Sequence, residues 1–320
     1  MNVPKQFSFS RYLAAKKSVD DRALNQHVWE ALVRNLPQPV PGAPLRVLEI
    51  GAGIGTMLER MLEWELLSYA DYTAIDSQSE SIAHVRQRLP SWADAHGYSC
   101  QEGHPNNWML ERQMHRIEAR FEACDLFKFI TRETGRRKWD LLVAHAFLDL
   151  MDIPNTLKQL TRLLVPSGLV YFTINFDGAT ILEPELDPEL DERIQKLYHQ
   201  TMDQRITDGR FSGDSRAGRH LFEHLKHSGI QVLDAGASDW VVFPEAQGYP
   251  EDQAYFLHFI IDTIRQALSG HPEVNSRRFV EWVNERHAQV ERAQLVYIAH
   301  QLDFLGKAAQ VDFVPQSNQQ

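Results

Sequence analysis

The stretch Val47-Leu48-Glu49-Ile50-Gly51-Ala52-Gly53-Ile54-Gly55 decides the fold class of this chain. Residues 44–47 lead into an apolar run, and an amphipathic run follows at 56–66. This order predicts a strand, a tight turn and a helix, because glycine lets the backbone turn sharply and approach a ligand where a side chain would clash. The helix would point its positive end at the turn. The stretch therefore predicts a nucleotide-binding site.

Two details distinguish between nucleotide cofactors. Thr56 stands where the dinucleotide fingerprint has its third glycine. The carboxylate of Glu49 would repel a pyrophosphate but suits a cationic ligand. At this point the chain resembles the class I S-adenosyl-L-methionine (SAM) dependent methyltransferases, whose first motif is an acidic residue followed by Gly-x-Gly-x-Gly. An ordinary glycine-rich turn without a ligand is the alternative.

The resemblance implies where the first motif meets the cofactor. Glu49 would lie near the amino-acid end of SAM, and the backbone of the turn would face its methionine and ribose portions. The turn residues concerned are Gly51, Ala52, Gly53 and Gly55.

Tyr72-Thr73-Ala74-Ile75-Asp76 predicts a short buried strand that ends in an acid. Asp76 follows the glycine turn by about 20 residues, where a ribose-binding acid lies in a βαβ nucleotide fold. A carboxylate only accepts hydrogen bonds, so it suits a diol with two O–H donors. The resemblance implies that Asp76 binds both ribose hydroxyls, with Ser77 beside it. Capping of the helix that begins near Ser79 is the alternative role of Asp76.

The next strand is predicted at residues 117–123, which alternate between apolar and polar. The resemblance implies that Asp125 accepts from the adenine amino group and that the backbone N–H of Leu126 reaches the ring. A plain loop acid is the alternative for Asp125, since Asp is common in turns. The connection at 77–116 is unusually long, and we expect an extra helix in it.

Trp139-Asp140-Leu141-Leu142-Val143-Ala144-His145 predicts a fourth strand. In the family the active site lies just beyond this strand, which implies that Ala144 lines the cofactor site. His145 is therefore the candidate catalytic residue, to position the cofactor, orient the acceptor or take a proton. A structural hydrogen bond is its alternative role. The Asn/Asp-Pro-Pro-Tyr/Phe signature of many methyltransferases that act on DNA bases and on glutamine is absent.

The pattern of elements predicts an α/β fold with a seven-stranded mixed sheet, its last strand antiparallel, with helices on both faces and helical lid insertions. We expect a helical cap at 1–40, a SAM-binding Rossmann-like core at 41–176, a helical insertion at 177–216, completion of the core at 217–305 with a helical insertion at 243–292, and a tail at 306–320. Helices are expected at 22–36, 154–164, 188–206, 219–228, 252–268 and 277–292, and the last strands at 168–176, 231–242 and 293–305.

The insertions follow strands five and six, near the carboxyl ends of the strands, where ligands bind in open α/β sheets. The helix at 252–268 is too apolar all round for a surface helix. We interpret the insertions and the cap as a lid over an acceptor pocket, and a homodimer surface is the alternative. The candidate acceptor-binding residues are Tyr12, Arg216, Arg219, His220, Tyr255 and His258.

Charge and composition narrow the class of protein. The formal net charge is −10, and no cluster of Lys and Arg exceeds Arg136-Arg137-Lys138. Nucleic acid is disfavoured as a substrate because phosphate contacts need a basic surface. Cys100 and Cys124 make no disulfide framework, which favours a reducing compartment. The first residues hold no apolar signal core and no apolar stretch could span a bilayer, so we expect a cytoplasmic protein without a membrane partner.

His220-Leu221-Phe222-Glu223-His224 matches a zinc-peptidase pattern, but it lies in a crossover helix, and we expect no metal. We expect a SAM-dependent methyltransferase that acts on a small-molecule acceptor by in-line displacement, with S-adenosylhomocysteine as product. The sulfonium is already activated, so the protein must mainly align the reactants, and a base is needed only for a protonated acceptor. The alternatives are a dinucleotide-dependent oxidoreductase and a non-catalytic SAM-binding protein.

Overall fold

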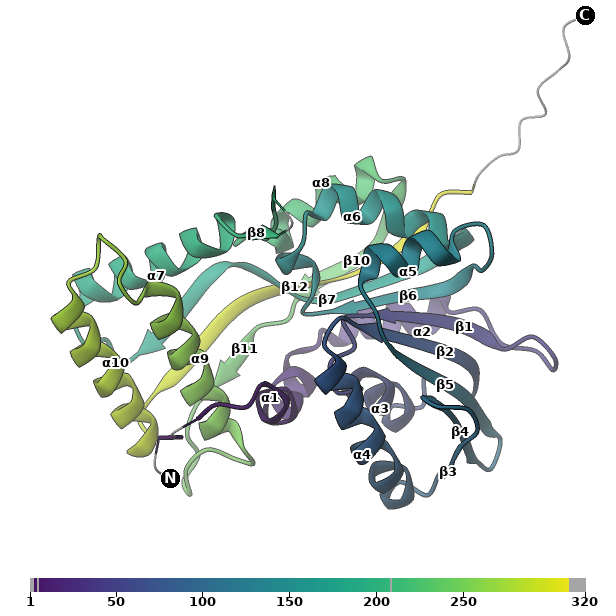
Figure 1. Ribbon diagram of the computed structural model, residues 1–320, viewed down its shortest axis with the longest axis horizontal. Helices are drawn as coiled ribbons and strands as arrows, with labels where there is room; N and C mark the ends of the chain where they lie inside the picture. The colour runs from purple at the N-terminus through teal and green to yellow at the C-terminus, as the bar shows by residue number, and fades with distance from the viewer. Residues whose placement is uncertain (1–2, 5, 208, 311–320) are drawn as a thin grey trace, which may run out of the picture.

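The computed structural model describes residues 3–4, 6–207 and 209–310, and within them one ten-stranded sheet forms the centre of the molecule (Figure 1). Its main part has the order β10 (Ile230–Ala237), β12 (Val296–Ala308), β7 (Leu164–Glu183), β6 (Trp139–His145), β1 (Leu45–Ile50), β2 (Tyr69–Asp76) and β5 (His115–Ala123). β12 is antiparallel to both of its neighbours, while β1 is parallel to β2 and β6. The mixed sheet with an antiparallel last strand is thus confirmed.

Three further strands make the sheet wider than the seven strands expected. β3 (Ser99–Glu102) and β4 (Asn107–Arg112) form an antiparallel hairpin on the edge of β5, and β11 (Trp240–Val242) pairs with β12. The extra helix expected at 77–116 was wrong, because α4 (Ser79–Ala95) is the crossover helix and the hairpin occupies the rest. Trp108 and Leu110 alternate with more exposed residues along β4 and bury the edge of the core.

Two expected elements are divided in the structure. The stretch expected to form one helix at 22–36 is divided near its start, because a first helix ends within it and a second begins. The cap therefore consists of α1 (Phe9–Ala23) and α2 (Gln26–Asn35). Asn25 separates them because its side chain accepts from the N–H of Val28 and caps α2. The strand expected at 231–242 divides into β10 and β11, where Asp239 accepts from the N–H of Gln301 on β12.

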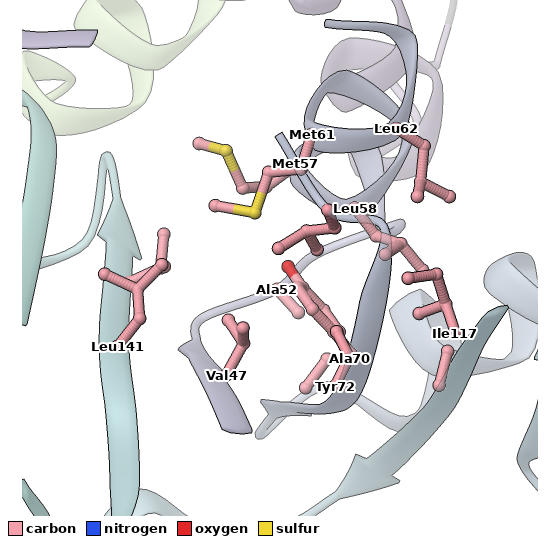
Figure 2. Close-up of a cluster of buried hydrophobic side chains, with 14 of the residues drawn as sticks. Val47, Ala52, Met57, Leu58, Met61, Leu62, Ala70, Tyr72, Ile117 and Leu141 are labelled. Carbon is pink, nitrogen blue, oxygen red and sulfur yellow. The ribbon is translucent and has the colours of Figure 1, made fainter. Parts of the chain in front are cut away.

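Helices cover both faces of the sheet. On one face lie α2, α3 (Thr56–Glu63) and α4, and on the other lie α5 (Leu126–Glu133), α6 (Ile153–Leu160) and α8 (Ala217–His227). Figure 2 shows how Met57 and Met61 of α3 pack towards Val47 and Tyr72 of the sheet. Full burial of one such side chain stabilises the fold by about 1.5–3 kcal/mol, so these contacts hold the glycine turn between β1 and α3.

A second apolar core lies beyond the sheet, at the left of Figure 1. The strand expected at 168–176 continues to Glu183, where the outer half of β7 pairs with the first residues of β12. Onto this ribbon pack α1, α7 (Pro188–Asp203), α9 (Gln253–Leu268) and α10 (Ser276–Glu291). We call these four helices and the outer ribbon the lid.

The remaining boundaries differ from expectation by a few residues. α6 ends at Leu160 and is followed by a short 3-10 helix, η2 (Thr161–Leu163), and α7 ends at Asp203, before the small hairpin of β8 (Ile206–Thr207) and β9 (Arg210–Phe211). The first residues of the expected tail belong to β12, and residues 311–320 lie outside the described residues. No helix in the described part of the chain is long and apolar enough to cross a membrane.

Candidate active site

The glycine turn adopts a backbone that only glycine accepts readily. Gly51, Gly53 and Gly55 have φ values of 68°, 53° and 83°, in the left-handed region that costs other residues about 1–2 kcal/mol each. The N–H of Ala52 donates to the carbonyl of Ile75, which joins the turn to the end of β2. Gly55 caps α3 without a side chain, so the first amides of this helix remain available to a ligand.

Two apolar side chains lie over this turn. A Cβ added to Gly51 would lie 2.3 Å from Cδ2 of Phe147, and one added to Gly53 would lie 3.0 Å from a methyl of Leu13 in α1. The sequence predicted the turn but not these two contacts, because Leu13 and Phe147 come from distant parts of the chain. Both side chains therefore lie close to the backbone of the turn.

Glu49 lies buried at the end of β1, directly before the turn. The residue is 2% exposed, and its carboxyl group accepts a hydrogen bond from the Tyr72 hydroxyl at 2.6 Å. Burial raises the pKa of Glu49 to about 8, and the bond from Tyr72 lowers it only in part. Glu49 is thus largely uncharged at neutral pH in the structure without a ligand, whereas the sequence predicted a carboxylate that suits a cationic ligand.

Asp76 ends β2 beside the glycine turn, as the sequence predicted. One carboxylate oxygen accepts from the N–H of Gly53 at 2.8 Å, and the other accepts from the N–H of Gln78 at 2.7 Å. Gln78, and not Asp76, is the cap of α4, so the alternative role of Asp76 as the helix cap does not apply. Ser77 is exposed next to it.

Asp125 and Leu126 lie at the same edge of the sheet, because the N–H of Cys124 donates to the carbonyl of Asp76. The side chain of Asp125 caps α5 by accepting from the N–H of Lys128 at 3.0 Å. The cap is therefore one observed role of Asp125, and its predicted contact with adenine stays a prediction. Leu126 is buried.

His145 ends β6, next to the buried Ala144, and both of its ring nitrogens are occupied. Nδ1 lies 2.8 Å from the Thr173 hydroxyl and Nε2 lies 2.9 Å from a carboxylate oxygen of Asp20. Burial lowers the pKa of His145 to about 4, although Asp20 opposes this shift. A neutral imidazole that donates from Nε2 and accepts at Nδ1 satisfies both contacts. His145 cannot take a proton from an acceptor unless one of these bonds breaks.

Asp20 of α1 joins the cap to this site. Its carboxylate accepts from Lys16 Nζ at 2.6 Å and from Trp240 Nε1 at 2.8 Å, in addition to His145. Burial alone would raise the pKa of Asp20, but Lys16 and His145 lower it below its usual range. Sequence reasoning missed Asp20. The available signal was the spacing of Lys16 and Asp20, four apart on one helix face.

The predicted acceptor residues divide into two groups. Tyr12 lies near Asp20, and its ring stacks on Phe259 with centroids 4.0 Å apart. Tyr255 bonds through its hydroxyl to the backbone of Ser8. His258 is 1% exposed and bonds to His287 and Glu291 of α10. The structure thus brings Tyr12, but not His258, to the group around Asp20.

The basic residues near the start of α8 form ion pairs at the surface. Arg219 makes a two-pronged contact with Asp177, and His220 lies 2.6 Å from Asp214. Arg216 is exposed. None of these contacts involves His145 or the glycine turn. In the described part of the chain no group of three or more His, Cys, Asp or Glu residues could hold a metal ion.

The geometry fits a SAM site, because left-handed glycines, free helix amides and Asp76 converge at one edge of the sheet. The family model described as "Methyltransferase domain" matches residues 22–207, more than half of the chain. The chain belongs to the methyltransferase domain family. This confirms the class I resemblance expected from Glu49 and the glycines, with SAM as the cofactor. No curated protein sequence matches the chain.

Several solved structures are similar in fold. A putative sarcosine dimethylglycine methyltransferase from Galdieria sulphuraria is 12% identical, with 94% of this chain and 85% of that chain covered and a TM-score of 0.38. A cyclopropane synthase from Mycobacterium tuberculosis is 10% identical, with coverage of 95% and 100% and a TM-score of 0.42. A SAM-dependent methyltransferase from Methanosarcina mazei is 12% identical, with coverage of 87% and 97% and a TM-score of 0.44. At these levels their acceptors do not carry over to this chain.

Proposed function

We propose that the protein transfers the methyl group of SAM to a small-molecule acceptor by in-line displacement. The observation that carries this proposal is the convergence of Gly53 and Asp76 at the carboxyl edge of the sheet, directly beneath α1. When bound, SAM supplies an electrophilic methyl group on a positively charged sulfur. The protein then has to align the acceptor and exclude water, which contributes several kcal/mol in well-oriented reactions.

The cofactor side follows from the residues around the turn. Asp76 would exchange its bond with the Gly53 amide for the ribose hydroxyls, with Ser77 beside it. Ala144 would line the site between β1 and β6. Asp125 and the backbone N–H of Leu126 would receive the adenine. Glu49 would lose its proton when it meets the positive charge of the cofactor, because a nearby cation lowers a carboxyl pKa.

His145 is better described as a positioning residue than as a base. Its two ring nitrogens form hydrogen bonds with Thr173 of β7 and Asp20 of α1, so His145 connects the lid to the sheet. Asp20 lies on the same helix as Leu13, so this tie would influence how closely α1 covers the glycine turn. We propose that His145 helps to close the lid over the cofactor and the acceptor.

The lid favours a small acceptor over a macromolecule. Its apolar core is built largely on the inserted helices and on α1, and the net charge of −10 disfavours an anionic polymer. Tyr12 is the acceptor-binding candidate nearest to Asp20. The homodimer through the inserted helices stays a prediction, which light scattering of the purified chain would test.

Calorimetry tests the cofactor assignment. We expect S-adenosylhomocysteine to bind and NAD to bind more weakly or not at all, and tighter binding of NAD would overturn the proposal. Incubation with methyl-labelled SAM and a metabolite pool then separates an enzyme from a protein that only binds SAM. Labelled product in the presence of the protein supports methyl transfer, and its absence at saturating SAM contradicts it.

A further inference from the structure

Three tyrosines of the lid core and one acid of a neighbouring short helix make no side-chain hydrogen bond to another side chain in the described part of the chain. Tyr12 of α1, Tyr198 of α7 and Tyr297 of β12 belong to the apolar core of the lid. Asp149 lies in η1 (Leu148–Leu150), the short 3-10 helix that follows β6. We call these four residues the phenol–acid cluster, and none of them is used by the cofactor site described above.

Several contacts place the members together. Phe256 joins two of them, since its ring lies 5.8 Å from Tyr12 and 6.0 Å from Tyr297. The pKa of the Tyr12 phenol is raised first by burial and then by the nearby charges of Asp20, Tyr297, Tyr198 and Asp149. These four side chains, from four different elements, therefore lie within electrostatic range of the Tyr12 phenol.

The loop before α8 places Asp149 beside the end of α7. A Cβ added to Gly213 would lie 2.7 Å from the carbonyl oxygen of Met202 in α7 and 3.5 Å from that of Asp149. Tyr198 is one turn before Met202, on the face that enters the lid core. Asp149 and Tyr198 thus approach each other from the sheet and from the lid.

These polar groups lack partners within the protein. Among the described residues no hydrogen bond engages the hydroxyl of Tyr12, Tyr198 or Tyr297, although Tyr297 is only 5% exposed. Oδ1 of Asp149 is fully buried and has no partner. Such a buried group costs about 1–3 kcal/mol when it stays unpaired. An orphaned carboxylate oxygen beside three phenol hydroxyls that make no hydrogen bond in the described part of the chain therefore indicates a ligand.

The charge of the cluster indicates which kind of ligand it would bind. Burial raises the pKa of Asp149 to about 6, and the cations that lower it, Arg205 and Lys16, form no ion pair with Asp149 within 4.0 Å in the described part of the chain. The charge of Asp20 is already paired with Lys16, so Asp149 carries the unpaired negative charge of the cluster. An anionic ligand would be repelled by Asp149, whereas a positively charged amine would supply an N–H donor to its unpaired Oδ1. The surrounding aromatic rings also attract a cation and bury an apolar body.

We propose that the phenol–acid cluster binds the acceptor and that the acceptor is a small amine with an apolar or aromatic body. This rests on the proposed function. Phe147, two residues before Asp149, lies against Gly51 of the cofactor turn. The cluster is thus near the place where the methyl group would be presented.

The test uses three probes of similar shape and different charge: 2-phenylethylamine, 2-phenylethanol and 3-phenylpropionate. Calorimetry of the full chain saturated with S-adenosylhomocysteine, at pH 7.5, measures the affinity of each. We expect the amine to bind at least ten-fold more tightly than the other two. Amine binding no tighter than that of the alcohol or the acid overturns the inference, including the case in which none of the three binds.

Variants assign the binding to the cluster. Asp149→Asn should weaken amine binding at least ten-fold, while Asp94→Asn, which removes an exposed carboxylate of α4, should leave it unchanged. Tyr297→Phe keeps the ring and removes the hydroxyl, so it tests the same site in a variant expected to fold. Equal binding by wild type, Asp149→Asn and Tyr297→Phe would overturn the inference. Failure to bind S-adenosylhomocysteine would instead contradict the proposed function.

Discussion

Replacement of Glu49 by Gln tests the charge state of the residue next to the glycine turn. The pKa of Glu49 rises from its ordinary value of 4.5 to about 8 because the side chain is buried. A folded-state pKa above the unfolded value means that the carboxyl group stabilises the fold below pH 4.5. This contribution is lost as the pH rises towards 8, since the unfolded chain releases the proton more readily.

The size of the effect follows from the same pKa. Each pKa unit corresponds to about 1.36 kcal/mol, so between pH 5 and pH 7.5 Glu49 should reduce the free energy of unfolding by roughly 3 kcal/mol. Gln keeps an oxygen that accepts from the Tyr72 hydroxyl and carries no titratable proton. The variant should therefore gain stability relative to wild type by about that amount over this range.

Urea denaturation of both proteins at pH 5.0, 6.0 and 7.5, without cofactor, measures the difference. Other titrating groups, such as Asp303 and Asp149, are common to both proteins and cancel in it. Tyr72→Phe is the companion variant, because it removes the donor and should deepen the loss of stability at high pH. If wild type and Glu49→Gln lose stability in parallel as the pH rises, Glu49 is ionised in the fold and the reasoning is wrong.

Three further predictions concern the same edge of the sheet. Asp76→Ala should weaken binding of S-adenosylhomocysteine by about 1.5–3 kcal/mol, whereas Ser77→Ala should change it little, and equal affinities would remove Asp76 from the ribose site. Leu13→Ala should speed association of S-adenosylhomocysteine in stopped-flow measurements, because Leu13 covers Gly53, and an unchanged rate would show that α1 does not control entry. The pKa of His145 is lowered to about 4, so the unfolded state takes up the proton first and stability should fall as the pH drops from about 6.5 towards 4. His145→Asn should show a shallower fall in urea denaturation, and an identical slope would contradict the neutral, buried imidazole.

The cofactor edge was predictable because its signals are local. The strand, the glycine turn and the helix from Val47 onwards are contiguous in sequence, and glycine is the residue that adopts the left-handed φ values observed there most readily. Asp76 lies at the end of the neighbouring strand, and parallel strands that end together place their last residues side by side. Sequence reasoning therefore located Gly53 and Asp76 within one site, 23 positions apart.

The edge hairpin and α1 were not predictable for a different reason. The alternation of buried and exposed residues along β4 is short, and its partner strand β3 is polar. Periodicity alone therefore does not distinguish this hairpin from a loop. The buried face of α1 includes Lys16 and Asp20, which do not form an apolar stripe. Such a helix is stable only because distant residues neutralise its buried charges.

By itself, the sequence determined the class of fold, the position of the glycine turn and the family, because each depends on residue types at short spacings. The tertiary structure alone decided the roles of the individual side chains. Asp20 and His145 are 125 positions apart in sequence. Their hydrogen bond nevertheless occupies a ring nitrogen of His145, the residue that the sequence indicated as the candidate base. Burial likewise changed Glu49 from a presumed anion into a largely neutral acid. Both results depend on which groups the fold excludes from water, and exclusion from water is a property of the packed chain that no local pattern specifies.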